Sequence, residues 1–147
     1  MDKQWVRYAL AIAAGMAVIF AGDRLLGVKI EVFSGIETFS FSWMLDVFFV
    51  PFIAGLAVSR VVRSRMGKWL AFLPPLFVRG ASYLYMYLYV YQDGKGFFYH
   101  LNVYYWGLCV ILSMEAANIG GLLGDVLVGA YRNAPKAPAR AAAEEAD

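Results

Sequence analysis

The chain has 147 residues, of which 61% are hydrophobic and 16% are charged, and its formal net charge is +2. A soluble domain with this apolar content would expose large apolar patches, so the composition predicts a single integral membrane domain. The near-neutral charge gives no argument for a nucleic-acid partner, and we expect none. The lone cysteine, Cys109, excludes an internal disulfide and a redox thiol pair, and we interpret it as a small buried hydrophobic residue.

Four apolar segments follow one another along the chain, and each is long enough for a membrane-spanning helix. The predicted spans are residues 5–26, 43–62, 69–91 and 101–131. The first imitates a signal peptide, but we interpret it as an uncleaved span because three further apolar segments hold the chain in the membrane. The sequence therefore predicts an all-α integral membrane protein with a four-transmembrane-helix bundle over residues 1–132. Residues 133–147, rich in Ala, Pro and charge, predict a disordered cytoplasmic tail.

Two stretches of the sequence carry a strand-like signal. Residues 28–42, in the first outer loop, alternate apolar and polar side chains around Ser34 and Gly35. This pattern is typical of a short extended hairpin, and an irregular loop is the equal alternative. Residues 83–106 could be drawn as an aromatic β-hairpin, but we favour helices because open strand edges are not tolerated in lipid.

The distribution of Lys and Arg predicts the orientation of the bundle. With the N-terminus in the cytoplasm, nine of the 13 Lys and Arg residues lie on that side. We therefore expect both termini in the cytoplasm and the chain in a bacterial inner (plasma) membrane. A basic block after the second span fixes this topology and faces anionic membrane lipids. It comprises Arg60, Arg63, Arg65 and Lys68.

An ionisable side chain lies near the middle of each of the last two predicted spans. Arg79 lies roughly 18 Å from the outer end of its span, and Glu115 lies roughly 19 Å from the outer end of the next. A short loop makes these spans antiparallel neighbours, so we predict a buried Arg79–Glu115 pair, with Asn118 on the same helical face as Glu115. Two interpretations stay open: a structural lock between helices, and part of a polar path or ligand site within the membrane.

Other polar residues lie closer to the predicted interfaces. Asp46 is about one turn inside the second span, where Arg24 is its expected partner, and the alternative is a proton or cation site in an outward-facing pocket. Pro51, in the same span, predicts a kink and a freed backbone carbonyl. Asp125 lies within reach of the basic block, and we expect a salt bridge there.

Aromatic side chains gather near the predicted outer face of the last two spans. We expect a belt at the membrane interface or, alternatively, a pocket for an isoprenoid, a quinone or an acyl chain with His100 at its mouth. The residues concerned are Tyr83, Tyr87, Tyr91, Tyr104 and Trp106. His100 is the only histidine, so the sequence offers no set of metal or haem ligands and predicts no cofactor.

Small residues in the last span predict close packing against another helix or a partner subunit. Gly120 and Gly124 stand at GxxxG spacing, and Ala117 and Gly121 accompany them.

The sequence contains no Walker A loop, Gly-x-Ser-x-Gly, His-Glu-x-x-His or Cys-x-x-Cys motif. Whether the chain is an enzyme stays open, and nothing in the sequence favours it. We expect a non-catalytic subunit of a larger membrane complex, which contacts membrane lipids and either other membrane subunits or copies of itself. One alternative is a transporter or channel component that uses Arg79, Glu115 and Asp46 as a polar path. The other is a lipid- or quinone-handling membrane enzyme with an aromatic outer pocket.

Overall fold

Within the described residues the fold is helical and contains no β-strand. The computed structural model describes residues 3–28, 33, 35–90 and 97–130. The helical segments that are long and apolar enough to cross a membrane are Lys3–Leu26, Phe41–Val62 and Leu101–Leu127. The predicted helical character and the presence of span-length apolar helices are confirmed to this extent. The count of four spans and the orientation of the termini stay predictions, and the tail lies outside the described residues.

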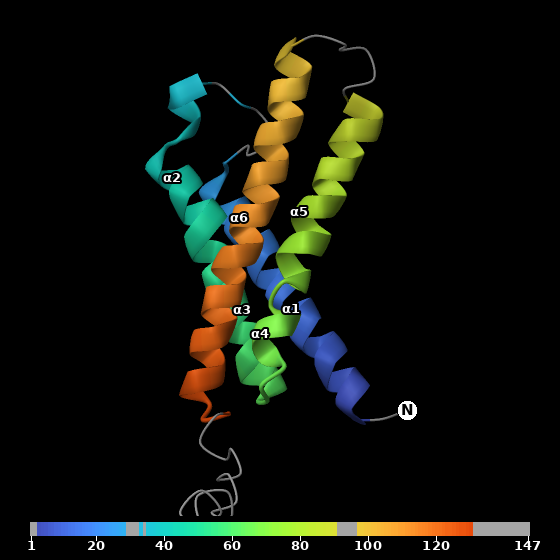
Figure 1. Ribbon diagram of the computed structural model, residues 1–147, viewed down its shortest axis with the longest axis vertical. Coiled ribbons are helices and arrows are strands. Elements are labelled where there is room, and N and C mark those ends of the chain that lie inside the picture. The colour runs from blue at the N-terminus through green and yellow to red at the C-terminus, as the bar shows by residue number, and fades with distance from the viewer. Residues whose placement is uncertain (1–2, 29–32, 34, 91–96, 131–147) are drawn as a thin grey trace, which may run out of the picture.

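The helices lie side by side in an elongated bundle (Figure 1). In chain order they are α1 Lys3–Leu26, the 3₁₀ turn η1 Gly35–Thr38, α2 Phe41–Met44, the π-helical η2 Leu45–Phe49, α3 Val50–Val62, α4 Gly67–Leu70, α5 Leu73–Tyr85, the π-helical η3 Met86–Val90 and α6 Phe97–Leu127. The segments α2, η2 and α3 continue one another. The start of α1 and the end of α6 lie at the same end of the bundle (Figure 1).

The third predicted span, residues 69–91, is not one continuous helix. α4 ends at Leu70, and α5 begins at Leu73 with Pro74 and Pro75 in its first turn. Proline lacks the N–H that a helix interior needs, but it suits a first turn, whose N–H groups have no partner within the helix. The proline pair therefore separates two helices. This segment is not among the three described helices of span length.

The loop between α1 and α2 contains no strand in the part that the structure describes. Gly35–Thr38 form the η1 turn, while residues 29–32 and 34 lie outside the described residues. Val28 and Phe33, from the predicted hairpin, pack instead against the cluster that includes Tyr105 of α6, and the ring centres of Phe33 and Tyr105 lie 5.1 Å apart. Packing against a helix therefore accounts for these two apolar positions without a partner strand.

The most extensive contact in the bundle joins α3 and α6, which run in the same direction (Figure 1). A Cβ atom added at Gly120 would overlap the carbonyl oxygen of Phe52, and one added at Gly55 would overlap that of Ala117. Only glycine lets the two backbones approach so closely. The predicted close packing of the small-residue face of the last helix is confirmed.

An aromatic core lies between η2, α2 and α6. The indole Nε1–H of Trp43 donates a 2.6 Å hydrogen bond to the hydroxyl oxygen of Tyr105, so both polar atoms are satisfied inside the core. Trp106 and Cys109 complete this cluster, and Cys109 is only 1% exposed. The prediction of a buried, hydrophobic role for the cysteine is confirmed.

Candidate functional site

Arg79, on α5, is the largest fully buried side chain among the described residues. Its Nη2 donates 2.6 Å to the backbone carbonyl oxygen of Asp46 and 3.2 Å to the Oδ2 atom of the same residue. It also lies 3.3 Å from Oδ1 of Asp23. We call these three residues the arginine cluster, and it joins α1, η2 and α5 in the interior of the bundle.

The backbone of η2 explains why Asp46 offers its carbonyl oxygen to an arginine. In the π register the N–H of Val50 bonds the carbonyl of Leu45, so it is not available to Asp46. The next residue along the chain is Pro51, which has no N–H. A buried carbonyl without a donor costs about 1–3 kcal/mol, and the guanidinium of Arg79 removes that cost. The freed carbonyl expected from Pro51 is therefore occupied by a side chain of another helix.

The arginine cluster contains one cationic and two anionic side chains. The side chains of Arg79 and Asp46 are 2% and 0% exposed, whereas that of Asp23 is 32% exposed. Charge-assisted hydrogen bonds of this kind are among the strongest in proteins, and breaking a buried pair leaves an uncompensated charge. The cluster can therefore hold three helical segments in one relative position.

Glu115 is not the partner of Arg79. No ion pair or hydrogen bond joins these two described side chains, and Glu115 is exposed on α6. Equal depth on two helices does not determine the direction in which side chains point. Arg79 points toward α1 and η2, which supply carboxylates, and Glu115 lines a groove beside α2, η2 and α3. Asn118, expected to join the pair, is half-buried on α6.

Arg24 is not the partner of Asp46 either. Its guanidinium lies 5.1 Å from the centre of the Phe20 ring, while Arg79 takes the Asp46 carboxylate. The acidic neighbour of Arg24, Asp23, reaches the cluster instead. Asp23 was not predicted as a partner of Arg79. Its position near the end of the first span, at a depth close to that of Asp46, could have indicated this contact.

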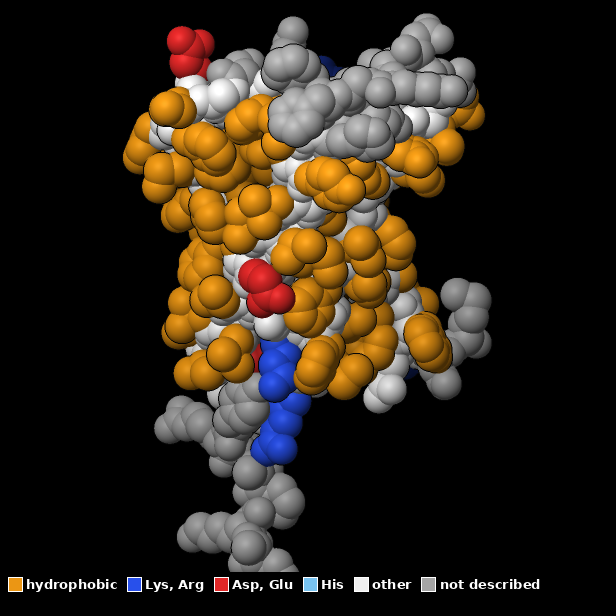
Figure 2. Space-filling view, turned by 45° about the horizontal axis from the view of Figure 1, so that its top comes forward, with side chains coloured by type: hydrophobic (Ala, Val, Ile, Leu, Met, Phe, Trp, Pro, Cys, Tyr) orange, Lys and Arg blue, Asp and Glu red, His pale blue; other side chains and the backbone are white. Residues whose placement is uncertain are grey.

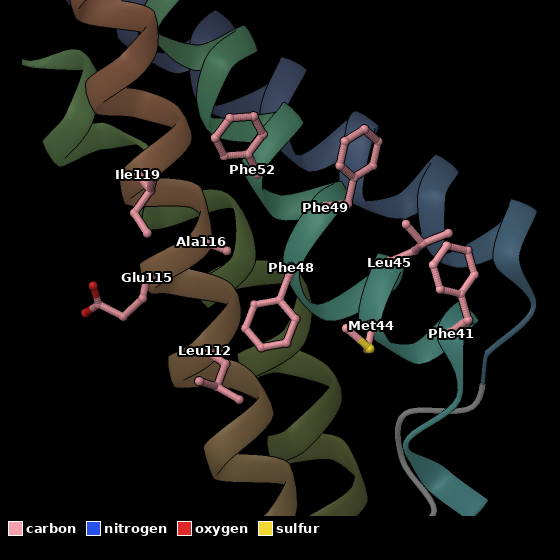
Figure 3. Close-up of a pocket in the computed structure, with 10 residues that line it drawn as sticks. All are labelled: Phe41, Met44, Leu45, Phe48, Phe49, Phe52, Leu112, Glu115, Ala116 and Ile119. Carbon is pink, nitrogen blue, oxygen red and sulfur yellow. The ribbon is translucent and has the colours of Figure 1, made fainter.

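A groove of about 450 Å³ lies between the α2–η2–α3 segment and α6 (Figure 3). We call it the aromatic groove, and its lining residues are Phe41, Met44, Leu45, Phe48, Phe49, Phe52, Leu112, Glu115, Ala116 and Ile119. Several of these side chains are widely exposed, among them Phe41 at 74% and Ile119 at 59%. Glu115 stands at the edge of the groove and points away from the phenyl rings (Figure 3).

Glu115 lies near the middle of the apolar part of α6. It follows Leu101 by 14 residues and precedes Leu127 by 12, which corresponds to roughly 21 and 18 Å along the helix. Hydrophobic side chains form a broad band on the face shown in Figure 2, and an acidic side chain interrupts that band. None of the residues in the described part of the chain hydrogen-bonds or pairs with the Glu115 carboxylate.

Asp125 is fully buried, and no salt bridge joins it to the described basic side chains. Its Oδ2 accepts the backbone N–H of Lys68 at 3.1 Å, in the first turn of α4. The first N–H groups of a helix have no partner within it, so a carboxylate from another helix satisfies one of them. The expected contact with the basic block is therefore made to the backbone rather than to a charged side chain.

The predicted aromatic residues are divided between the surface and the core. The rings of Tyr83 and Tyr87 stack with their centres 6.4 Å apart, Tyr104 is 75% exposed, and Trp106 is buried. A belt and a pocket both stay predictions. Outside the described side chains lie Tyr91 and His100.

No family model, curated protein or solved structure matches the chain. The arginine cluster and the aromatic groove are therefore the features from which a function is inferred.

Proposed function

We propose that the chain is an integral protein of a bacterial inner membrane and a non-catalytic subunit of a larger membrane complex. It crosses the membrane four times, with both termini in the cytoplasm, and it joins a partner subunit through the aromatic groove. The observation that carries this proposal is Glu115, an exposed carboxylate in the middle of an apolar helix of span length.

The position of Glu115 indicates the chemistry of the partner. A charged side chain at the centre of a transmembrane helix costs about 2.5–3.5 kcal/mol on insertion scales. A cationic or hydrogen-bond-donating side chain of a second helix would offset this cost, and the exposed rings of the aromatic groove would provide packing surface for that helix. The proposed occupant is therefore a transmembrane helix with Lys, Arg or another donor near its middle.

A second copy of the chain suits the aromatic groove less well. The cation that lies deep within the described helices, Arg79, is 2% exposed and already engaged with Asp23 and Asp46. A symmetric contact would also bring two Glu115 carboxylates toward each other. A phospholipid carries its charge at the interface, far from the middle of α6. A different subunit therefore provides the complementary charge.

The arginine cluster supports a structural role in preference to a polar path. Arg79 and Asp46 contact each other in the interior, whereas Glu115 is exposed beside the aromatic groove. The three residues named for a transport path thus do not come together. The internal cluster rigidifies the bundle that presents the groove.

Site-specific photocrosslinking in membranes of the organism that encodes the chain tests this proposal. A photoreactive residue is placed in the groove at Phe48 or Ile119, and the control position is Leu10 on α1, which is 60% exposed and outside the groove. We expect one discrete membrane-protein adduct from both groove positions and none from Leu10. Adducts of equal yield from all three positions would contradict a specific interface.

Variants of Glu115 test the predicted charge complementarity. We expect E115Q, which keeps hydrogen-bonding capacity, to reduce co-purification of the crosslinked partner, and E115K to abolish it. A Lys or Arg of the partner changed to Glu should restore binding to E115K. If E115K retains the partner as well as the unchanged chain does, Glu115 is not the contact.

A further inference from the structure

A second pocket, of about 410 Å³, lies at the end of the bundle where α3 and α6 terminate. It is lined by Arg60, Arg63, Leu127 and Val128. Two guanidinium groups thus share one hollow with two aliphatic side chains, which are 61% and 36% exposed. Such a lining suits a ligand that carries an anionic group and an apolar body.

The cations at this end of the bundle differ in whether they already have a partner. Arg7 donates from Nε to the Val61 carbonyl oxygen at 2.7 Å, and Arg65 donates to a backbone carbonyl at 3.3 Å. In the described part of the chain, Arg60 and Arg63 make no hydrogen bond or ion pair through their side chains. The two arginines that line the pocket therefore have their whole guanidinium groups unengaged within the described residues.

The backbone at Arg63 provides an independent observation. This residue ends α3 in the left-handed conformation, with φ of 49°, and it is the one non-glycine residue with positive φ in the described ranges. Glycine is the usual residue at such a helix end, because a side chain is strained there. Strained positions cluster at binding sites, where the side chain is needed.

We propose that this pocket binds the phosphate group of an anionic phospholipid. The guanidinium groups of Arg60 and Arg63 donate to the phosphate oxygens, a geometry that arginine matches well. Leu127 and Val128 contact the glycerol and the first acyl carbons. The aliphatic wall distinguishes a lipid from free phosphate, which would gain nothing from it.

The test is native mass spectrometry of the delipidated full chain in detergent, titrated with phosphatidylglycerol or with zwitterionic phosphatidylcholine. We expect the unchanged chain to prefer phosphatidylglycerol, and R60Q/R63Q to bind it about 30-fold more weakly, given the usual worth of a basic residue near an anionic lipid. The matched control K3Q/K68Q removes the same charge from residues that do not line the pocket, so it should weaken binding clearly less than R60Q/R63Q does.

A single variant, R63G, distinguishes the contribution of the Arg63 side chain from that of its backbone conformation. R63G removes the guanidinium but suits the left-handed conformation, so the chain should fold at least as stably while it binds phosphatidylglycerol about fivefold more weakly. Equal losses in R60Q/R63Q and K3Q/K68Q would overturn the proposal. So would displacement of the lipid by an equimolar amount of inorganic phosphate, which would identify a free-anion site.

Discussion

The Nη2 atom of Arg79 lies 2.6 Å from the backbone carbonyl oxygen of Asp46, which the π turn and Pro51 leave without a backbone donor. The proline creates a buried acceptor, and the buried guanidinium requires one. Each feature would be costly alone, since an unpaired polar or charged group in an apolar interior is strongly disfavoured. Together they fix the position of α5 relative to η2.

Replacing Arg79 with leucine leaves the Asp46 carboxylate buried and unpaired. We expect R79L to lower the free energy of unfolding by about 3–5 kcal/mol, as is typical when one partner of a buried pair is removed. The double variant R79L/D46L should regain much of this loss because neither of the two charges stays in the interior. Unfolding in dodecyl sulfate, followed by circular dichroism, provides the measurement. Equal losses in the single and double variants would contradict the prediction that the unpaired Asp46 carboxylate causes the loss.

Replacing Pro51 with alanine restores an N–H and lets η2 relax to an ordinary α-helix. The N–H of Val50 would then bond the Asp46 carbonyl, so Arg79 would lose that contact. We expect the loss of unfolding free energy caused by R79L to be smaller by about 1.5–3 kcal/mol when P51A is also present. P74A is the control, since a first-turn residue needs no N–H. A similar reduction in both backgrounds would contradict the role of Pro51.

A methyl group at Gly120 would have to displace the Phe52 backbone. We expect G120A to lower the free energy of unfolding by about 1–3 kcal/mol, as overpacking does in tight contacts. At Gly107, on the same helix, an added Cβ atom would meet nothing within 4 Å. G107A should therefore raise stability by about 0.5–1 kcal/mol through helix propensity. The same unfolding titration measures both changes in the free energy of unfolding, which should have opposite signs. A lower free energy of unfolding in both variants would show that α6 tolerates no added side chain.

Removal of the Tyr105 hydroxyl leaves the indole N–H of Trp43 buried without an acceptor. We expect Y105F to cost about 1–3 kcal/mol of unfolding free energy. Y104F alters a side chain that is 75% exposed, and a surface change of this kind stays within about 0.5 kcal/mol. Thermal unfolding monitored by tryptophan fluorescence compares the two variants. Equal melting temperatures would mean that the Trp43–Tyr105 hydrogen bond adds no stability.

Hydropathy and small-residue spacing predicted much of the fold. The first, second and fourth predicted spans correspond to the helices Lys3–Leu26, Phe41–Val62 and Leu101–Leu127. These predictions rest on properties summed over many residues, so errors at single positions matter little. The break after Leu70 was not predicted. Apolar content alone gives residues 69–91 the length of a span, but Pro74 and Pro75 lack the backbone N–H groups that a continuous helix would need there.

The partners of Arg79 could not be predicted from depth alone. Axial position follows from counting residues, but the direction of a side chain also depends on the helical phase. The π turn of η2 changes that phase between Asp46 and α3. Glu115 was the predicted acceptor and Asp46 was expected to pair with Arg24, but the rotation of α6 leaves Glu115 on the exposed surface.

The contact between Asp125 and the Lys68 N–H has a consequence for biosynthesis. Asp125 belongs to the last helix of the chain, while α4 is made much earlier. The ribosome therefore completes α4 and α5 before the carboxylate that caps α4 has been synthesised. We infer that the turn between α3 and α5 gains this hydrogen bond only after α6 has been synthesised. A middle segment of the chain thus matures last.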